Sequence, residues 1–335
     1  MPARRGESHG GGTGEGPVSG PGKPLSGALA ILVAAVLWGT TGTAATFAPG
    51  VSAAAIGAAA MGIGGLLQAA VAGAGIARAR TLLARHWRDL ALGAASVAVY
   101  PLAFYASMRM AGVTIGTVIS IGSAPLLAAL IEYRMEGLRL TRRWLTGAAL
   151  GLAGMLLMSL AEATGRPMPG GASPVAGILL GLIAGLTYAM YSWTARRLMR
   201  NGVPSMAAMG ATFGAGGLLL LPVLLATGAP FLASWSNAAV GAYMATVPMF
   251  LGYLCFGYGL ARIAASTATT ITLFEPVVAA GLAVLVVGER MPPLGWLGVG
   301  LVVLCLVIVS APAGRRPGPV ANPVAAEPRL RRAGP

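Results

Sequence analysis

Charged side chains are scarce in this sequence. Asp, Glu, Lys and Arg make up 10% of the 335 residues, whereas 56% are apolar and the mean hydropathy is +0.77. Soluble globular domains carry about 25% charged residues, so this composition indicates a membrane protein with several spans. Long strand-like alternations of polar and apolar residues are also missing, which argues against a membrane β-barrel.

Cysteine and histidine are almost absent, with two of each. Cys255 and Cys305 each lie inside an apolar run, where packing is a better explanation than a disulfide. His9 and His86 have no metal-ligand spacing around them, and the sequence contains no nucleotide-binding motif or catalytic triad. We therefore expect no metal site, no cofactor and no enzymatic activity.

The net charge of +14 could suggest a nucleic-acid-binding protein. However, the basic residues fall in short clusters between apolar runs rather than along one polar face. The lipid bilayer, and not a nucleic acid, is therefore the expected partner.

Ten apolar segments have about the 20 residues that a helix needs to cross a bilayer. Because a helix satisfies every backbone polar group within its own segment, we predict an all-α integral membrane protein with ten transmembrane helices. The predicted segments are 26–47, 53–77, 90–108, 113–132, 144–161, 175–195, 204–227, 238–260, 264–287 and 292–311. Residues 1–25 and 312–335 are low in apolar periodicity and are predicted to be disordered tails.

The loops between these segments differ in charge. The short loops on one side hold twelve arginines, and those on the other side hold only Arg109, Arg166 and Arg290. Positive residues are enriched in cytoplasmic loops, so the twelve-arginine side and both termini are predicted to lie in the cytoplasm.

The two halves of the chain repeat one another weakly. Three pairs match at offsets of 150 to 152 residues: Trp38-Gly39 with Tyr188-Ala189, Pro125 with Pro276, and Trp144 with Trp296. We predict two five-helix repeats, 26–161 and 175–311, joined by the loop 162–174. Five is an odd number, so the second repeat enters the membrane the opposite way round, and such inverted repeats are typical of transporters.

Several motifs resemble the EamA-type branch of the drug/metabolite transporter superfamily. They are Leu37-Trp38-Gly39, Ala124-Pro125, Glu136 and Trp144 in the first repeat, and Glu275-Pro276, Gly288-Glu289-Arg290 and Trp296 in the second. The resemblance covers about residues 26 to 311. It implies a transporter for small metabolites, and we expect an exporter of amino acids or related compounds in the inner membrane. The composition, rich in Gly, Ala and Arg and nearly without Lys, indicates a bacterium. It also implies that the first, third, fourth, sixth, eighth and ninth helices line a central cavity.

Glu275 is the one carboxylate predicted near the middle of a span, and Thr269 and Thr272 precede it at helical spacing. An ionised carboxylate in lipid is costly, so such residues usually face a cavity or a partner. We expect Glu275 either to bind a cationic solute or a coupling proton, or to act structurally beside Pro276. The sequence leaves both interpretations open.

Aromatic and serine side chains within the spans are further candidates for solute contact. Ring faces bind apolar and cationic groups, and serine hydroxyls donate hydrogen bonds. Tyr100 with Phe104, and Phe250 with Tyr253, are predicted to share helix faces. Packing is an equally open role for each member of the set, which comprises Trp38, Tyr100, Phe104, Ser120, Ser123, Tyr188, Tyr191, Phe250 and Tyr253.

Pro125 and Pro276 occupy matching positions in the two repeats and are candidate hinges, because each proline leaves a helix carbonyl unpaired. Together these features predict a secondary transporter that works by alternating access on a small-molecule solute, as a monomer or homodimer. An integral-membrane enzyme or lipid-modifying protein, or a channel-like facilitator, remains the alternative. Saturable flux with counterflow would distinguish a carrier from both.

Overall fold

The computed structural model describes residues 22–111, 113–163, 174–287 and 291–310. Within these ranges the regular structure is helical, and ten helices are long and apolar enough to cross a bilayer. The prediction of an all-α, multi-pass membrane protein is thereby confirmed. Residues 1–21 of the predicted N-terminal tail, the whole predicted C-terminal tail and residues 164–173 of the inter-repeat loop lie outside the described residues, as does the motif Gly288-Glu289-Arg290. Residues 22–25 of the predicted N-terminal tail belong to α1 instead.

The first half of the chain contains five spans. The first is divided between α1 (Gly22–Gly39) and α2 (Thr41–Ala45), and α1 begins four residues before the predicted start of that span. The others are α3 (Ala53–Arg78), α5 (Trp87–Ala111), α6 (Val113–Glu136) and α7 (Arg142–Ala163), with the short α4 (Arg80–Arg85) between α3 and α5. Ser52 caps α3 by accepting a hydrogen bond from the Ala55 N–H at 3.1 Å, which defines where that helix begins.

The second half also contains five spans, two of which are interrupted. Three are regular: α8 (Pro174–Arg200), α9 (Ser205–Thr227) and α14 (Pro293–Ser310). The eighth span follows the 3₁₀ turn η1 (Ala229–Leu232) and consists of α10 (Trp235–Met244), the π-helical η2 (Ala245–Leu251) and α11 (Gly252–Leu260). The ninth consists of α12 (Ala265–Ile271), the 3₁₀ turn η3 (Thr272–Phe274), α13 (Glu275–Leu282) and the π-helical η4 (Ala283–Val287).

Helices at equivalent positions in the two halves pack against each other. α3 contacts α9, α6 contacts α12, and α7 contacts α14. Two further pairs are equivalent to each other. The third span (α5) packs on the sixth (α8), and the first span (α1) packs on the eighth (α11). This pattern is unchanged when the two halves are interchanged, as expected for a molecule built from two repeated units.

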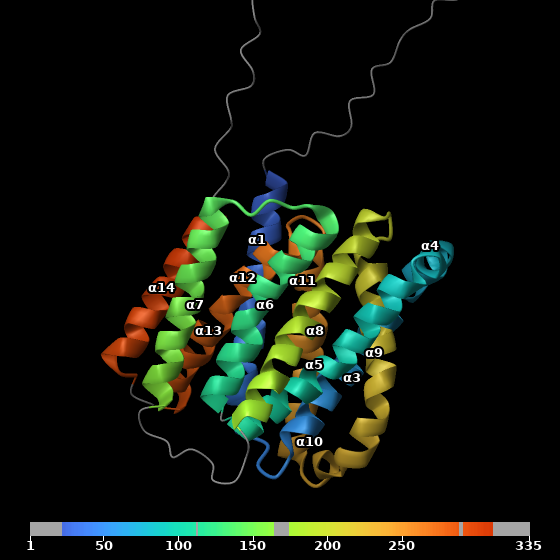
Figure 1. The fold of residues 1–335 in the computed structure, drawn as a ribbon. Helices are drawn as coiled ribbons and strands as arrows, with labels where there is room; N and C mark the ends of the chain where they lie inside the picture. The colour runs from blue at the N-terminus through green and yellow to red at the C-terminus, as the bar shows by residue number, and fades with distance from the viewer. Residues whose placement is uncertain (1–21, 112, 164–173, 288–290, 311–335) are drawn as a thin grey trace, which may run out of the picture.

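Glycines allow the closest of these contacts. A Cβ atom at Gly154 on α7 would lie 2.6 Å from the carbonyl oxygen of Gly298 on α14, and one at Gly65 on α3 would lie 2.2 Å from that of Phe213 on α9. Small residues let membrane helices approach in this way. Since α1 begins and α14 ends at the same end of the bundle, where α4 also lies, that end is called here the α4 end (Figure 1).

Candidate solute-binding site

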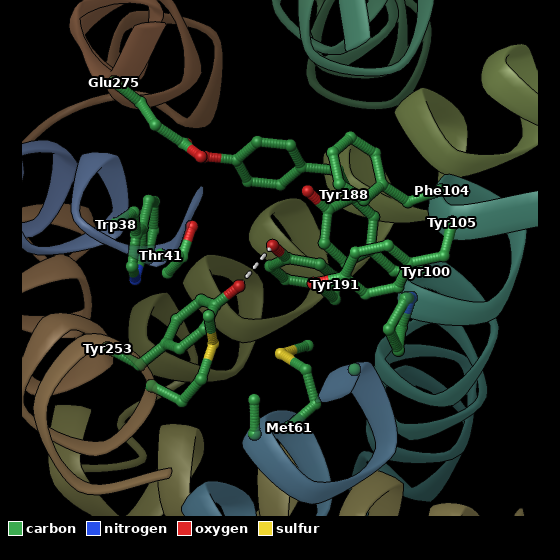
Figure 2. Close-up of a pocket in the computed structure, with 14 residues that line it drawn as sticks. Trp38, Thr41, Met61, Tyr100, Phe104, Tyr105, Tyr188, Tyr191, Tyr253 and Glu275 are labelled. Atoms are coloured by element: carbon green, nitrogen blue, oxygen red, sulfur yellow. Dashed lines mark hydrogen bonds between the residues drawn. The ribbon is translucent and has the colours of Figure 1, made fainter. Parts of the chain in front are cut away.

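A pocket lies where the two halves meet, and side chains from both halves line it (Figure 2). The residues from α3 belong to its first three turns, and Thr41 lies at the end of the first span, so the pocket is displaced away from the α4 end. Its lining comprises Trp38, Thr41, Gly57, Ala60, Met61, Tyr100, Pro101, Phe104, Tyr105, Tyr188, Tyr191, Met249, Tyr253 and Glu275.

Trp38 fixes one wall of the pocket. Its indole N–H donates a hydrogen bond of 2.9 Å to the carbonyl oxygen of Pro248, in the π-helical segment of the eighth span. The indole ring lies 4.7 Å from the ring of Tyr253 and meets Tyr188 edge-on at 6.5 Å. Only 4% of Trp38 is exposed, so this residue is held in one orientation by both polar and ring contacts.

Tyrosine hydroxyl groups link the helices behind this wall. The Tyr191 and Tyr253 hydroxyls are 2.9 Å apart, joining α8 to α11 (Figure 2). The Tyr188 hydroxyl lies 2.9 Å from the Thr272 hydroxyl, joining α8 to η3. The rings of Tyr188 and Tyr191 are stacked at 5.2 Å, and Tyr100 contacts both. Hydrogen bonds and ring packing therefore pre-organise one aromatic surface from α5, α8 and α11.

Glu275 supplies the one ionisable carboxyl group among the described lining residues. It opens α13 directly after η3, and Pro276 stands in the first turn of α13, where its missing N–H costs nothing. The side chain is partly exposed and makes neither a hydrogen bond nor an ion pair with any residue in the described ranges. The helix start favours a negative charge at this position, and the cavity leaves it accessible.

Seven of the residues proposed from the sequence meet in this pocket. They come from five spans and are Trp38, Tyr100, Phe104, Tyr188, Tyr191, Tyr253 and Glu275. Thr272 adjoins the pocket through Tyr188, whereas the Thr269 hydroxyl donates to carbonyl oxygens one turn earlier, those of Ala265 and Ser266.

Phe250, Ser120 and Ser123 do not line the pocket. Tyr253 lines the pocket, whereas Phe250 lies in the π-helical segment, where the turn is wider than in an α-helix and α-helical spacing does not apply. Ser120 and Ser123 instead pack against α8, where a Cβ at Gly185 would lie 2.8 Å from the carbonyl oxygen of Ser120.

The two candidate hinge prolines differ in their surroundings. Pro276 lies at a break between a 3₁₀ turn and a new helix, whereas α6 continues through the buried Pro125. The ninth span therefore has an interruption that its counterpart, the fourth span, lacks.

Sequence reasoning missed Tyr105, Thr41 and Met61 as lining residues. Tyr105 follows Pro101 by four positions, so that spacing could have placed both on one face of α5. Met61 and Thr41 carry no comparable signal, because neither differs from an ordinary packing residue of a membrane helix.

A second cluster of polar residues lies nearer the α4 end, and the sequence analysis did not anticipate it. Glu132 is fully buried near the end of α6, within the fourth span but away from its middle. Its carboxylate accepts hydrogen bonds from the backbone N–H groups of Ala265 at 2.7 Å and Ser266 at 3.2 Å. The Arg196 guanidinium lies 3.9 Å away and donates to the carbonyl oxygen of Ile263 at 2.6 Å.

Further charged contacts surround this cluster. Glu136 accepts a hydrogen bond from the Trp193 indole at 3.0 Å and pairs with Arg200. Arg197 lies over the Trp193 ring and pairs with Asp89 at 3.1 Å. Ion pairs and hydrogen bonds thus join α5, α6, α8 and the start of α12 at one end of the bundle, while the aromatic pocket lies towards the other.

The chain belongs to the EamA-like transporter family, whose model matches residues 25–160 and 175–311. An uncharacterized transporter of Bacillus subtilis, YwfM, is 32% identical over 84% of this chain and 93% of its own length. A protein of Streptantibioticus cattleyicolor named a probable terminal-alkyne amino-acid exporter is 25% identical over 57% of this chain and 62% of its own. A crystal structure of another protein shares the fold, with a TM-score of 0.69, 22% identity, and coverage of 84% of this chain and 96% of that one.

Proposed function

We propose that this protein is a secondary transporter that exports amino acids or related small metabolites across the inner membrane. Its two halves form inverted repeats, both termini lie in the cytoplasm, and the pocket is the solute site of an alternating-access cycle. The observation that carries the proposal is the position of the pocket, which takes Trp38 and Tyr100 from the first half and Tyr188, Tyr253 and Glu275 from the second. Sites at repeat interfaces are characteristic of carriers.

The proposed direction of opening follows from charge and packing. The α4 end carries the arginine-rich loops, which supports a cytoplasmic position for it, and buried polar contacts of Glu132 join the two halves there. The pocket lies towards the opposite face, so the conformation corresponds to one closed to the cytoplasm. The Streptantibioticus cattleyicolor relative, named a probable terminal-alkyne amino-acid exporter, supports amino acids as the solute class. A proton is the proposed coupling ion.

Counterflow in proteoliposomes tests this function. Purified protein is reconstituted with a panel of unlabelled amino acids and amines inside, and uptake of the labelled compound is followed. A carrier gives saturable flux and transient accumulation. Flux that rises linearly without counterflow indicates a channel-like facilitator, and chemical change of the solute indicates an enzyme.

Matched tyrosine variants connect the flux to the pocket. Tyr253→Ala removes a lining ring and is expected to raise the KM about fivefold, in line with the loss of one aromatic contact. Tyr133→Ala on α6 is the control, because that ring is 54% exposed and lies outside the pocket. Equal changes of KM in the two variants would show that the pocket does not bind the transported solute.

A further inference from the structure

The described lining of the pocket contains an acidic side chain but no basic one. Among the described residues its lining contains one carboxyl group, that of Glu275, and no Lys, Arg or His. Arg109 is the basic residue one turn beyond Tyr105 on α5, and it is exposed and not part of the lining. A solute in the pocket therefore meets a carboxyl group without a positive side chain beside it among the described lining residues.

The aromatic residues add to the same preference. Trp38 and the rings of Tyr100, Tyr188, Tyr191 and Tyr253 surround the cavity beside Glu275 (Figure 2). Ring faces attract cations, and several rings with a carboxylate form the kind of cage that holds organic ammonium groups. Glu275 has no partner among the described residues, so an incoming ammonium would not have to displace one.

A solute carboxylate finds no cationic donor among the described lining residues. The start of α13 could offer backbone N–H groups, but its first residue is the acidic Glu275 and the second, Pro276, has no N–H. The hydroxyls of Tyr188, Tyr191 and Tyr253 already pair with Thr272 or with each other. The remaining lining hydroxyls are neutral donors, which solvate a carboxylate less strongly than Lys or Arg; they belong to Thr41, Tyr100 and Tyr105. An anionic group would thus be desolvated beside the Glu275 carboxyl group without a cationic partner, which is unfavourable.

We propose that the pocket selects organic monocations, namely primary amines with an apolar or aromatic body, over zwitterionic amino acids. This proposal rests on the proposed function. It narrows the transported solutes to amines related to amino acids. Glu275 binds the ammonium group, the ring faces of Tyr188 and Tyr253 contact the body of the solute, and the lack of a cationic partner excludes a free carboxylate.

A matched ligand series tests this selectivity on the purified full-length protein. Binding of labelled phenylethylamine is measured in competition with phenylalaninamide, phenylalanine and 3-phenylpropionate, which share one ring and differ in charge. Phenylalaninamide is expected to compete at least about tenfold better than phenylalanine, and phenylpropionate not at all. Equal or tighter binding of phenylalanine overturns the proposal, as does failure of every amine to bind.

Two variants locate the source of the selectivity. Glu275→Gln is expected to weaken phenylethylamine binding about tenfold, and Arg109→Gln to leave it unchanged. Loss of phenylalanine binding in Arg109→Gln would mean that a carboxylate is held at the pocket mouth and would overturn the proposal. Counterflow of amino acids without amine binding would also overturn it while leaving the transporter function intact. If Glu275→Gln misfolds, the ligand series on the wild-type protein still tests the selectivity for amines over amino acids.

Discussion

The Ser266 hydroxyl donates a hydrogen bond of 2.5 Å to the carboxylate of Glu132, across the boundary between the two halves of the protein. Glu132 belongs to the fourth span and Ser266 to the ninth, which are equivalent helices of the two repeats. Because the carboxylate also accepts both N–H groups at the start of α12, one side chain satisfies three donors in a fully buried position. This contact holds the two halves together on the side of the pocket nearer the α4 end.

Replacing Glu132 should therefore destabilise the protein. Glu132→Ala leaves the buried N–H groups of Ala265 and Ser266 without an acceptor and removes a charge near Arg196, at a cost of about 1–3 kcal/mol for each unsatisfied group. The measurement is thermal unfolding of the purified protein in one detergent, with a lower midpoint expected for the variant.

Glu136→Ala is the matched control for this variant. Its carboxylate also bonds to two side chains, but one of them, Arg200, is 55% exposed and can be hydrated when the partner is lost. Its midpoint should fall less than that of Glu132→Ala. A fall of equal size in both variants would show that burial of Glu132 adds nothing to the contact.

The orientation of the chain is tested by single cysteines in a variant whose Cys255 and Cys305 are replaced by Ala. Leu232 in η1 is 89% exposed, and Asn201 is exposed beyond the end of α8. An impermeant thiol reagent added to intact cells should label Leu232→Cys and should label Asn201→Cys only after the cells are opened. The reverse labelling would invert the topology and place the pocket on the cytoplasmic side.

Close helix packing predicts that alanine substitution at two glycines changes the stability of the protein in opposite directions. Gly154→Ala puts a methyl group against the Gly298 carbonyl oxygen of the facing helix, which should cost about 1–3 kcal/mol through overpacking. Gly300→Ala, on an exposed face of α14 with open space around the new Cβ, should be neutral or stabilise by up to about 1 kcal/mol. Thermal unfolding under identical conditions compares the two, and destabilisation by both would argue against the α7–α14 contact.

Hydropathy alone predicted all ten spans, because length and apolar composition are local properties of the chain. The break in the ninth span lies beside Pro276, a predicted hinge, whereas the π-helical segment before Tyr253 was not predicted. That segment contains Pro248, whose carbonyl oxygen accepts a hydrogen bond from Trp38, 210 residues away. Glu132 was missed for a similar reason. It stands at the end of its apolar run and resembles an ordinary boundary residue, while its partner Ser266 is 134 residues away.

The aromatic part of the candidate site was more accessible to sequence reasoning. Tyrosine and tryptophan are rare in this chain, so those within spans, such as Trp38 and Tyr188, stand out from the aliphatic background. Their spacing predicts which of them share a helix face only where the helix is regular. It did so for Tyr100 and Phe104 on α5, whose rings stack at 5.7 Å, but not for Phe250, which lies within the π-helical segment and does not line the pocket.

The last prediction concerns proton coupling through Glu275. If its carboxyl group exchanges a proton for the solute, efflux of solute should accelerate when the outside of the membrane is made more acidic than the inside. Glu275→Gln keeps the size of the side chain and its capacity for hydrogen bonding but cannot ionise. It should therefore fold normally and transport at a rate that is lower and independent of the imposed pH gradient.

The measurement is solute efflux from proteoliposomes at several external pH values, with the amount of reconstituted protein determined in parallel. Glu136→Gln serves as the control, since that carboxylate lies near the α4 end and outside the pocket, and its pH dependence should match the wild type. A Glu275→Gln variant with wild-type rate and pH dependence would make this residue structural, as the residue that opens α13 beside Pro276, and would leave solute exchange or facilitated diffusion as the mechanism.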